Sequence, residues 1–109
     1  MLPEEGCLLR VFIGESDRRG DQPLYEWLVL QAREQGLAGA TVLRGIMGFG
    51  PRSRIQTAKI LRLSQDLPIV VEIVDTRERL EAFLKIVESE IREGLVTLEG
   101  AKVQLYRSG

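Results

Sequence analysis

The stretch 69–91 reads IVVEIVDTRERLEAFLKIVESEI and joins a strand to the clearest helical pattern of the chain. Its first six residues are apolar except for Glu72, which is typical of a strand. Asp75 and Glu78 have the spacing of a capping box, and Gly94 is expected to end the helix. Between them, apolar residues at helical spacing form one stripe, which consists of Leu80, Phe83, Leu84, Val87 and Ile91.

The residues before this unit predict a second unit of the same kind. Residues 7–13 are short and β-rich, so we expect them to form the first strand. A polar loop over 14–22 leads to Pro23, which suits the first turn of a helix because its missing N–H is not needed there. A helix then follows up to an expected stop at Gly36, with an apolar face made of Leu24, Trp27, Leu28 and Ala32.

The remaining segments complete the predicted fold. A second strand is expected over 40–47, and a final strand over 95–98 and 103–106 is interrupted at Gly100. Residues 51–54 read as a basic loop, whereas 55–63 fit either an extended arm or a short helix. The order β-α-β-β-α-β predicts an α+β, ferredoxin-like sandwich, in which two helices cover one face of a four-stranded antiparallel sheet.

The predicted strands carry apolar residues on both faces of this sheet. In the first strand, Leu8 and Phe12 fall on the face opposite to Leu9, Val11 and Ile13. The third strand repeats the pattern, with Ile69, Val71 and Ile73 opposed to Val70 and Val74. Because the helices cover only one face, the other face needs a second cover. Oligomerisation through the open face is the simplest expectation.

Composition limits the classes of function. The chain has 109 residues, 44% hydrophobic and 28% charged, which fits one soluble domain over 1–109. A net charge of −1 gives no bulk attraction to nucleic acid or to an anionic membrane. Histidine is absent and Cys7 is the only cysteine, so we expect neither a metal site nor an enzyme. The acidic N-terminus and the lack of a long apolar run favour a cytoplasmic protein.

Four segments carry a recognisable pattern: IGESD at 13–17, GLAGATVLRGIMGFG at 36–50, LPIVVEIVD at 67–75 and GLVTLE at 94–99. Together they resemble the PII-like family known as domain of unknown function 190. That family is similar to the PII nitrogen-signalling proteins, which are trimers that bind adenine nucleotides between subunits and contact membrane transporters or enzymes through a long loop. The resemblance therefore implies a homotrimeric, ligand-responsive regulator, with a transporter or channel as its partner.

The resemblance also implies a set of ligand-binding residues. Thr41 occupies the place of a threonine that contacts adenine in PII proteins, and residues 48–50 repeat the Gly-Phe-Gly at the base of their loop. The spacing from Thr41 to this motif is one residue longer, which predicts a bulge. Arginines after the motif offer planar forks for a phosphate, or a surface for a partner protein. The expected set is Thr41, Gly48, Phe49, Gly50, Arg52, Arg54, Gly94 and Arg107.

Departures from the PII pattern narrow the expected ligand. Segment 92–96 is shorter than the phosphate-binding loop of PII proteins and lacks its lysine, which leaves Arg107 as the C-terminal phosphate contact. Loop 51–67 lacks the tyrosine that PII proteins modify. These losses favour AMP or a cyclic nucleotide over ATP with magnesium, and no cofactor is expected to be required.

Other interpretations of the same residues stay open. A trimeric metal-tolerance or scaffold protein of the CutA type, with no nucleotide ligand, shares this fold, although the missing histidine argues against it. Carboxylates Glu15 and Asp17 suggest a cation site or acid–base chemistry, but two carboxylates are few for such a site, and a solvated turn or a subunit contact explains them better. Arg44 is a further candidate ligand contact. Glu72 is expected either at a sheet edge or as the buried partner of an arginine across the trimer.

Overall fold

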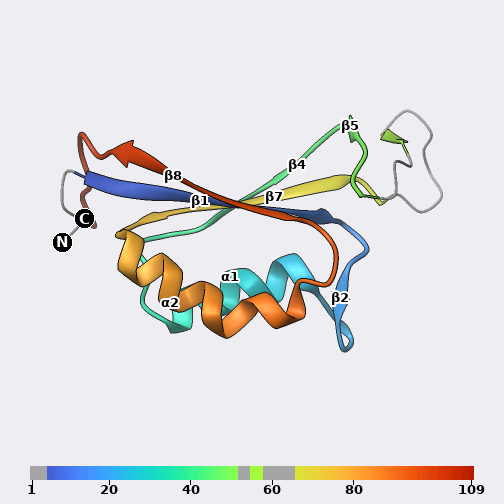
Figure 1. Ribbon diagram of the computed structural model, residues 1–109, viewed down its shortest axis with the longest axis horizontal. Helices are drawn as coiled ribbons and strands as arrows, with labels where there is room; N and C mark the ends of the chain where they lie inside the picture. Colours follow the sequence, from blue (N-terminus) through green and yellow to red (C-terminus); the bar gives the residue numbers. More distant parts are fainter. Residues whose placement is uncertain (1–4, 52–54, 58–65) are drawn as a thin grey trace.

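The computed structural model describes residues 5–51, 55–57 and 66–109. Its main elements follow the order β1 (Glu5–Gly14), α1 (Leu24–Glu34), β4 (Thr41–Arg44), β7 (Pro68–Asp75), α2 (Arg77–Val87) and β8 (Leu95–Lys102). The four strands form one antiparallel sheet in the order β4-β7-β1-β8, and both helices lie on the same face of it (Figure 1). This confirms the ferredoxin-like α+β fold.

Five short elements of the described chain lie outside this frame. β2 (Arg18–Arg19) and β3 (Gln22–Pro23) form a hairpin before α1, and a 3₁₀ turn, η1 (Glu88–Glu90), follows α2. β5 (Met47–Gly48) pairs with β6 (Gln56–Thr57) in a separate two-stranded sheet. The expected second strand is therefore broken at 45–46, inside the interval where the sequence predicts a bulge. The expected features at 52–54 and 58–65 lie outside the described residues.

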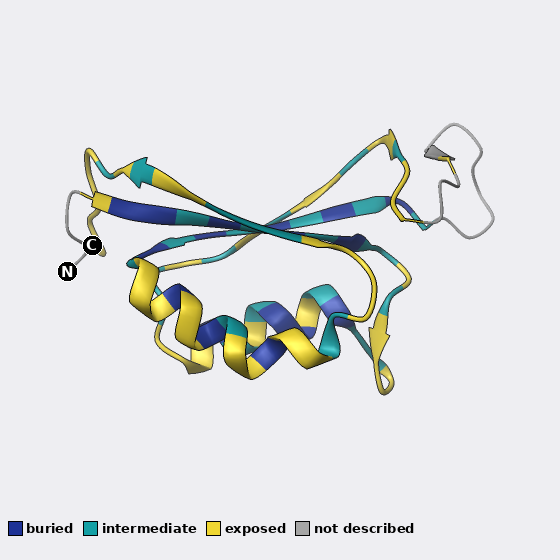
Figure 2. Ribbon diagram, viewed as in Figure 1, coloured by how far each residue is buried: buried dark blue, intermediate teal, exposed yellow. Residues whose placement is uncertain are grey.

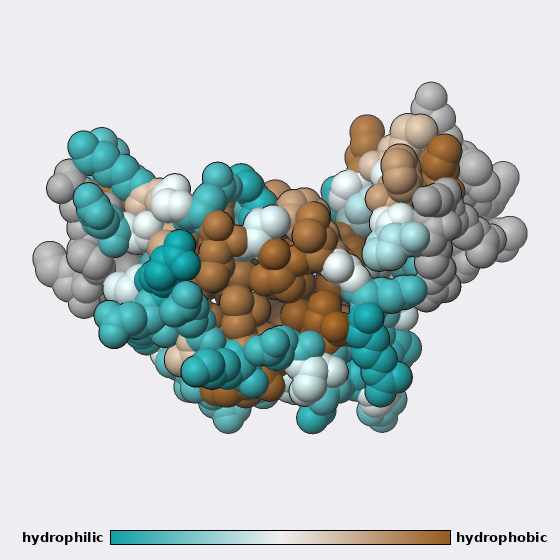
Figure 3. Space-filling model, in the orientation of Figure 1, coloured by the Kyte–Doolittle hydropathy of each residue, from teal (hydrophilic) through white to brown (hydrophobic). Residues whose placement is uncertain are grey.

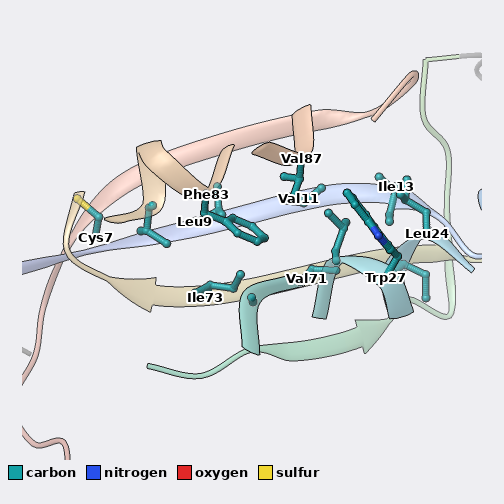
Figure 4. Packing of buried hydrophobic residues seen from close by; sticks show 14 residues of the cluster. Cys7, Leu9, Val11, Ile13, Leu24, Trp27, Val71, Ile73, Phe83 and Val87 are labelled. Atoms are coloured by element: carbon teal, nitrogen blue, oxygen red, sulfur yellow. The ribbon is translucent and has the colours of Figure 1, made fainter. Parts of the chain in front are cut away.

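The core fills the space between the sheet and the two helices. The register of β1 with β7 sets Leu9 opposite Ile73 and Val11 opposite Val71, so both strands send the same alternation set towards the helices. Trp27 of α1 and Phe83 of α2 close over them, as the close-up in Figure 4 shows. Complete burial of each such side chain stabilises the fold by about 1.5–3 kcal/mol.

The helix ends differ from the sequence prediction. The cap of α2 is Thr76, whose hydroxyl accepts a hydrogen bond from the N–H of Arg79 at 3.2 Å, so the Asp75–Glu78 capping box is wrong. Asp75 is fully buried instead, and its carboxylate accepts the N–H of Ala38 at 2.8 Å, which ties the chain before β4 to the end of β7. α2 ends at Val87, well before Gly94.

The last strand also differs. β8 runs without interruption through Gly100, because pairing with β1 continues to Lys102. Residues 103–106 are not a strand. They cross the end of the sheet, where the hydroxyl of Tyr106 donates to the carbonyl of Ala38 at 3.1 Å. The β-rich composition of residues 103–106 therefore does not produce a strand, because tertiary contacts outweigh local β-propensity.

The open face of the sheet is partly apolar, as its alternation pattern predicts. Leu8 and Phe12 lie opposite Val74 and Val70, and these residues are half-buried rather than buried (Figure 2). No helix in the described ranges is long and apolar enough to cross a membrane.

Charged residues occupy the middle of the open face. Arg10 bridges Glu72, at 2.9 Å, and Glu99, at 2.6 Å, both on neighbouring strands. The hydrogen bond to Glu72, supported by the charges of both carboxylates, raises the pKa of the Arg10 guanidinium. Glu72 is therefore not at a sheet edge, and within one chain it is half-buried and pairs with Arg10. Its burial against an arginine across a trimer stays a prediction.

Candidate functional site

One end of the sheet is hollowed. β1 ends there, β7 and β8 begin there, and β5 lies beside them (Figure 1). Between these elements lies a cavity of about 820 Å³. Its wall consists of Phe12, Ile13, Gly14, Ser16, Asp17, Gly48, Phe49, Gly50, Pro51, Asp66, Pro68, Ile69, Glu93, Gly94 and Leu95.

The cavity brings together four of the eight residues that the sequence analysis names. Gly48, Phe49 and Gly50 line one side of it, and Gly94 lines another, although some 45 positions separate them in the chain. Phe49 is two-thirds exposed at its rim. These residues come from the segment after β4 and the segment before β8, so tertiary structure alone makes them neighbours.

Two of the other four residues, Thr41 and Arg107, do not line the cavity. Thr41 is exposed on the open face, on the edge strand β4 opposite Glu72. Arg107 is exposed in the segment after β8, next to Tyr106, which contacts the chain before β4. Arg52 and Arg54 lie outside the described residues. Within one chain, therefore, the expected adenine and C-terminal phosphate contacts are not part of this cavity.

Two glycines shape the cavity wall. Gly94 has a φ of +146°, and a Cβ there would lie 2.4 Å from the carbonyl oxygen of Phe12. A Cβ on Gly48 would lie 2.9 Å from Cγ of Pro68. At both positions a Cβ would come too close to a neighbouring atom, the backbone carbonyl of Phe12 or the ring of Pro68, so glycine fits best there. The glycines thus let three chain segments converge at this end of the sheet.

Sequence reasoning missed the carboxylates as part of the same wall. Asp17, Asp66 and Glu93 line the cavity together with the hydroxyl-bearing Ser16. The carboxylate-rich turn after β1 is visible in the sequence. Asp66 lies about 50 positions away, and nothing in the sequence connects it with this turn. Arg44, a candidate ligand contact, instead forms an ion pair with Glu15 at 2.6 Å and is absent from the wall.

Hydrogen bonds fix the turn after β1 to the chain before β7. Asp66 accepts the N–H of Ser16 at 2.8 Å, and the carboxylate of Asp17 accepts the N–H of Gly14 at 3.0 Å. The other two amides of the turn donate to carbonyl oxygens, Glu15 to Leu67 at 2.9 Å and Asp17 to Gly14 at 3.2 Å.

Metal binding has no support in the part of the chain that the structure describes. No group of three or more His, Cys, Asp or Glu side chains there is placed to hold an ion. Glu15 and Asp17 are held by Arg44 and by the N–H of Gly14, which fits a structured turn. Cys7 is buried at the start of β1. The cavity is therefore the strongest candidate site among the described residues.

Comparison with solved structures places this fold among PII-like proteins. CPII, a nitrogen regulatory PII-like protein from Thiomonas intermedia K12 whose structure holds ADP, AMP and bicarbonate, matches with a TM-score of 0.69 and 15% identity, over 91% of this chain and 88% of CPII. CutA from Synechococcus elongatus matches with a TM-score of 0.55 and 14% identity, over 94% of this chain and 84% of CutA. At these identities the likeness shows the fold alone.

Comparison of sequences gives the family. A UPF0166 protein from Aquifex aeolicus is 41% identical over 96 residues, which cover 88% of this chain and 90% of the relative. The model of the family DUF190, described as an uncharacterised ACR, matches residues 6–103. The resemblance read from the four sequence segments is thereby confirmed, and the chain belongs to the DUF190 family, with a PII-like fold.

Proposed function

We propose that this protein is a cytoplasmic, non-catalytic PII-like regulator that binds an adenine nucleotide, AMP or a close analogue, at the cavity beside Gly48, Phe49, Gly50 and Gly94. The protein acts as a homotrimer with the ligand in clefts between subunits. The bound and free forms differ in affinity for a partner, a membrane transporter or channel. Such a switch works only because the ligand stabilises one form more than the other.

The observation that carries this proposal is the convergence of the glycine motif and Gly94 on one cavity. Its volume lies within the range of about 300–1,000 Å³ that is typical of small-molecule sites. Apolar Phe49 and Leu95 stand at the wall beside polar Ser16, a mixture that suits an aromatic base with polar substituents. The CPII structure with ADP and AMP supports a nucleotide as the ligand class.

The open face of the sheet supports an oligomer. Leu43 of β4 and Leu95 of β8 are about half exposed at its two edges, beside the half-buried Phe12 and Val70. An apolar sheet face of this kind is stabilised by a second cover. Thr41 also lies on this face, so association of copies through it is a way to bring Thr41 and the cavity into one cleft.

The first test is a thermal-shift screen against AMP, ADP, ATP, cyclic nucleotides and the guanine equivalents. A ligand at 100 times its Kd adds about 2.7 kcal/mol of stability, which gives a clear rise in Tm. Sedimentation equilibrium should give the mass of three chains. A flat response across the whole panel would contradict nucleotide binding, and a monomer at every concentration would contradict the trimer.

Two glycine variants connect the response to the cavity. Gly50→Val adds a side chain at the wall, where a Cβ has open space, and should abolish the adenine response without unfolding the protein. Gly39→Val is the matched control, because a Cβ there also has open space and the residue lies outside the cavity wall. Equal responses in both variants would place the ligand elsewhere.

The CutA interpretation makes the opposite prediction. It expects binding of copper and no response to any nucleotide. A calorimetric titration with a copper salt distinguishes the two, since the regulator proposed above should give no specific heat. Incubation of AMP, ADP or ATP with magnesium and the protein should likewise give no product if the protein is not an enzyme.

A further inference from the structure

Consecutive backbone N–H groups that are free in a turn can bind an anion. In this protein all four N–H groups of residues 14–17 already have acceptors. Two of these acceptors are carboxylates, those of Asp17 and Asp66. The turn therefore has no N–H group left to donate to a phosphate, and the carboxylates of Asp17 and Asp66 would repel it.

Gly14 fits the carboxylate of Asp66 closely. A Cβ at position 14 would lie 2.6 Å from Oδ1 of Asp66 and 3.2 Å from its Oδ2, so a side chain there would force the carboxylate out of place. The bond from the N–H of Ser16 to the same Oδ1 is 2.8 Å long. Asp66 thus sits in a recess formed by the turn and lines the cavity at the same time.

The described wall of the cavity has a one-sided charge. Asp17 and Asp66 place two carboxylates on it, and no lysine or arginine belongs to its described part. Arg44, which lies nearby on β4, is paired with Glu15. Carboxylates close to a second anion repel it strongly when both are partly removed from water. The inner wall therefore disfavours phosphate.

We propose that the negative charge of Asp66 sets the orientation of the ligand in this cavity. The nucleoside end of the ligand enters the cavity, and its phosphate end stays at the opening. This inference rests on the proposed function and specifies its ligand class. A nucleoside presents N–H and O–H donors on its base and ribose, and carboxylates accept such donors, as acidic residues do with ribose hydroxyls in dinucleotide sites.

The expected selectivity follows from this orientation. Each added phosphate brings more negative charge towards Asp17 and Asp66, so affinity should fall from AMP to ADP to ATP when no divalent cation is present to neutralise it. Adenosine should bind about as well as AMP. Asp66 is therefore a specificity-determining residue, and it need not be the main source of affinity.

The experiment is calorimetric titration of the full chain with adenosine, AMP and ATP in EDTA. The test variant is Asp66→Asn, whose amide oxygen still accepts the N–H of Ser16 while the charge is removed. We expect the ratio of the ATP Kd to the AMP Kd to fall about tenfold, because the charge that repels the added phosphates is gone, whereas adenosine should gain no affinity. Asp17→Asn should lower the same ratio, which guards against a folding defect in one variant.

The matched control is Asp21→Asn, which removes the same charge from an exposed residue outside the cavity wall. Its ratio should equal that of the unaltered protein. Nucleotide binding with equal Kd values for AMP and ATP, or an Asp66→Asn ratio equal to that of the control, would overturn the role of Asp66 and leave the proposed function intact. Failure of all three ligands to bind the unaltered protein would overturn both.

Discussion

The two faces of the sheet are built from alternate residues of the same strands, yet they differ sharply. Leu9 and Val11 of β1 are at most 1% exposed under the helices, whereas Leu8 and Phe12, which flank them in the strand, remain half-buried. Figure 2 shows this alternation along the strands. The comparison indicates that the helix face is complete within one chain, and that the open face is only partly covered by it.

Charge separates the two faces further. The open face carries Arg10 between Glu72 and Glu99, whereas the helix face is apolar apart from Asp75 at its margin. Paired charges of this kind suit a surface that meets water or another protein, because a fully buried pair brings a large desolvation cost. The open face thus has the mixed character of an interface rather than of a core.

A third apolar region lies on the helix side of the sheet, at its edge. Apolar side chains gather between α2 and the edge strand β8, on the side of the molecule shown in Figure 3. Partly buried Leu84, Val96 and Leu98 belong to this region and pack against the core. It is continuous with the core and so differs from the open face.

The largest effect that tests the comparison comes from a matched pair in β1. Leu9→Ala should lower the free energy of unfolding by about 2–5 kcal/mol at any protein concentration, since it leaves a cavity in the core. Leu8→Ala removes the same atoms from the open face, so its effect should be smaller and should grow with protein concentration. Urea unfolding at several concentrations measures both. Equal losses in dilute solution would mean that the faces are equally buried within one chain.

A smaller effect is expected where the chain passes from the helix layer back to the sheet. Gly94→Ala should cost about 1–3 kcal/mol, because the residue has a positive φ and its Cβ would meet the carbonyl of Phe12. Gly100→Ala, in β8 with open space around the Cβ, is the control and should be almost neutral. Thermal unfolding measures the difference. Similar Tm values for the two variants would contradict the close approach at Gly94.

The smallest effect concerns the ions of the open face. Arg10→Gln should lower the unfolding midpoint of the assembled protein slightly, and the change should persist in about 1 M NaCl if copies cover this face, because covered pairs escape screening. Arg77→Gln breaks the Arg77–Glu81 pair on the exposed surface of α2, and its effect should vanish in salt. If salt removes both effects, the open face remains in contact with water.

Particular residues show which features of the fold could be predicted from the sequence. Alternation along 7–13 and 69–74 predicted both faces of the sheet, because side-chain direction in a strand depends only on position. The cap was misassigned to Asp75 since Asp and Thr are both good caps, and burial of Asp75 against Ala38 made Thr76 the cap. Pairing of β8 with β1 carried the last strand through Gly100 in the same way.

The candidate site was likewise determined partly by local sequence and partly by tertiary structure. Local motifs by themselves determined the family, the fold class, and the expectation that Gly48, Phe49, Gly50 and Gly94 bind a ligand. Only the tertiary structure brought Asp66 onto the turn after β1 and gave the cavity its carboxylate wall, while leaving Thr41 and Arg107 away from it. The reason is physical: a motif fixes local backbone and side-chain type, whereas charge and shape in a cavity depend on contacts between residues far apart in the chain.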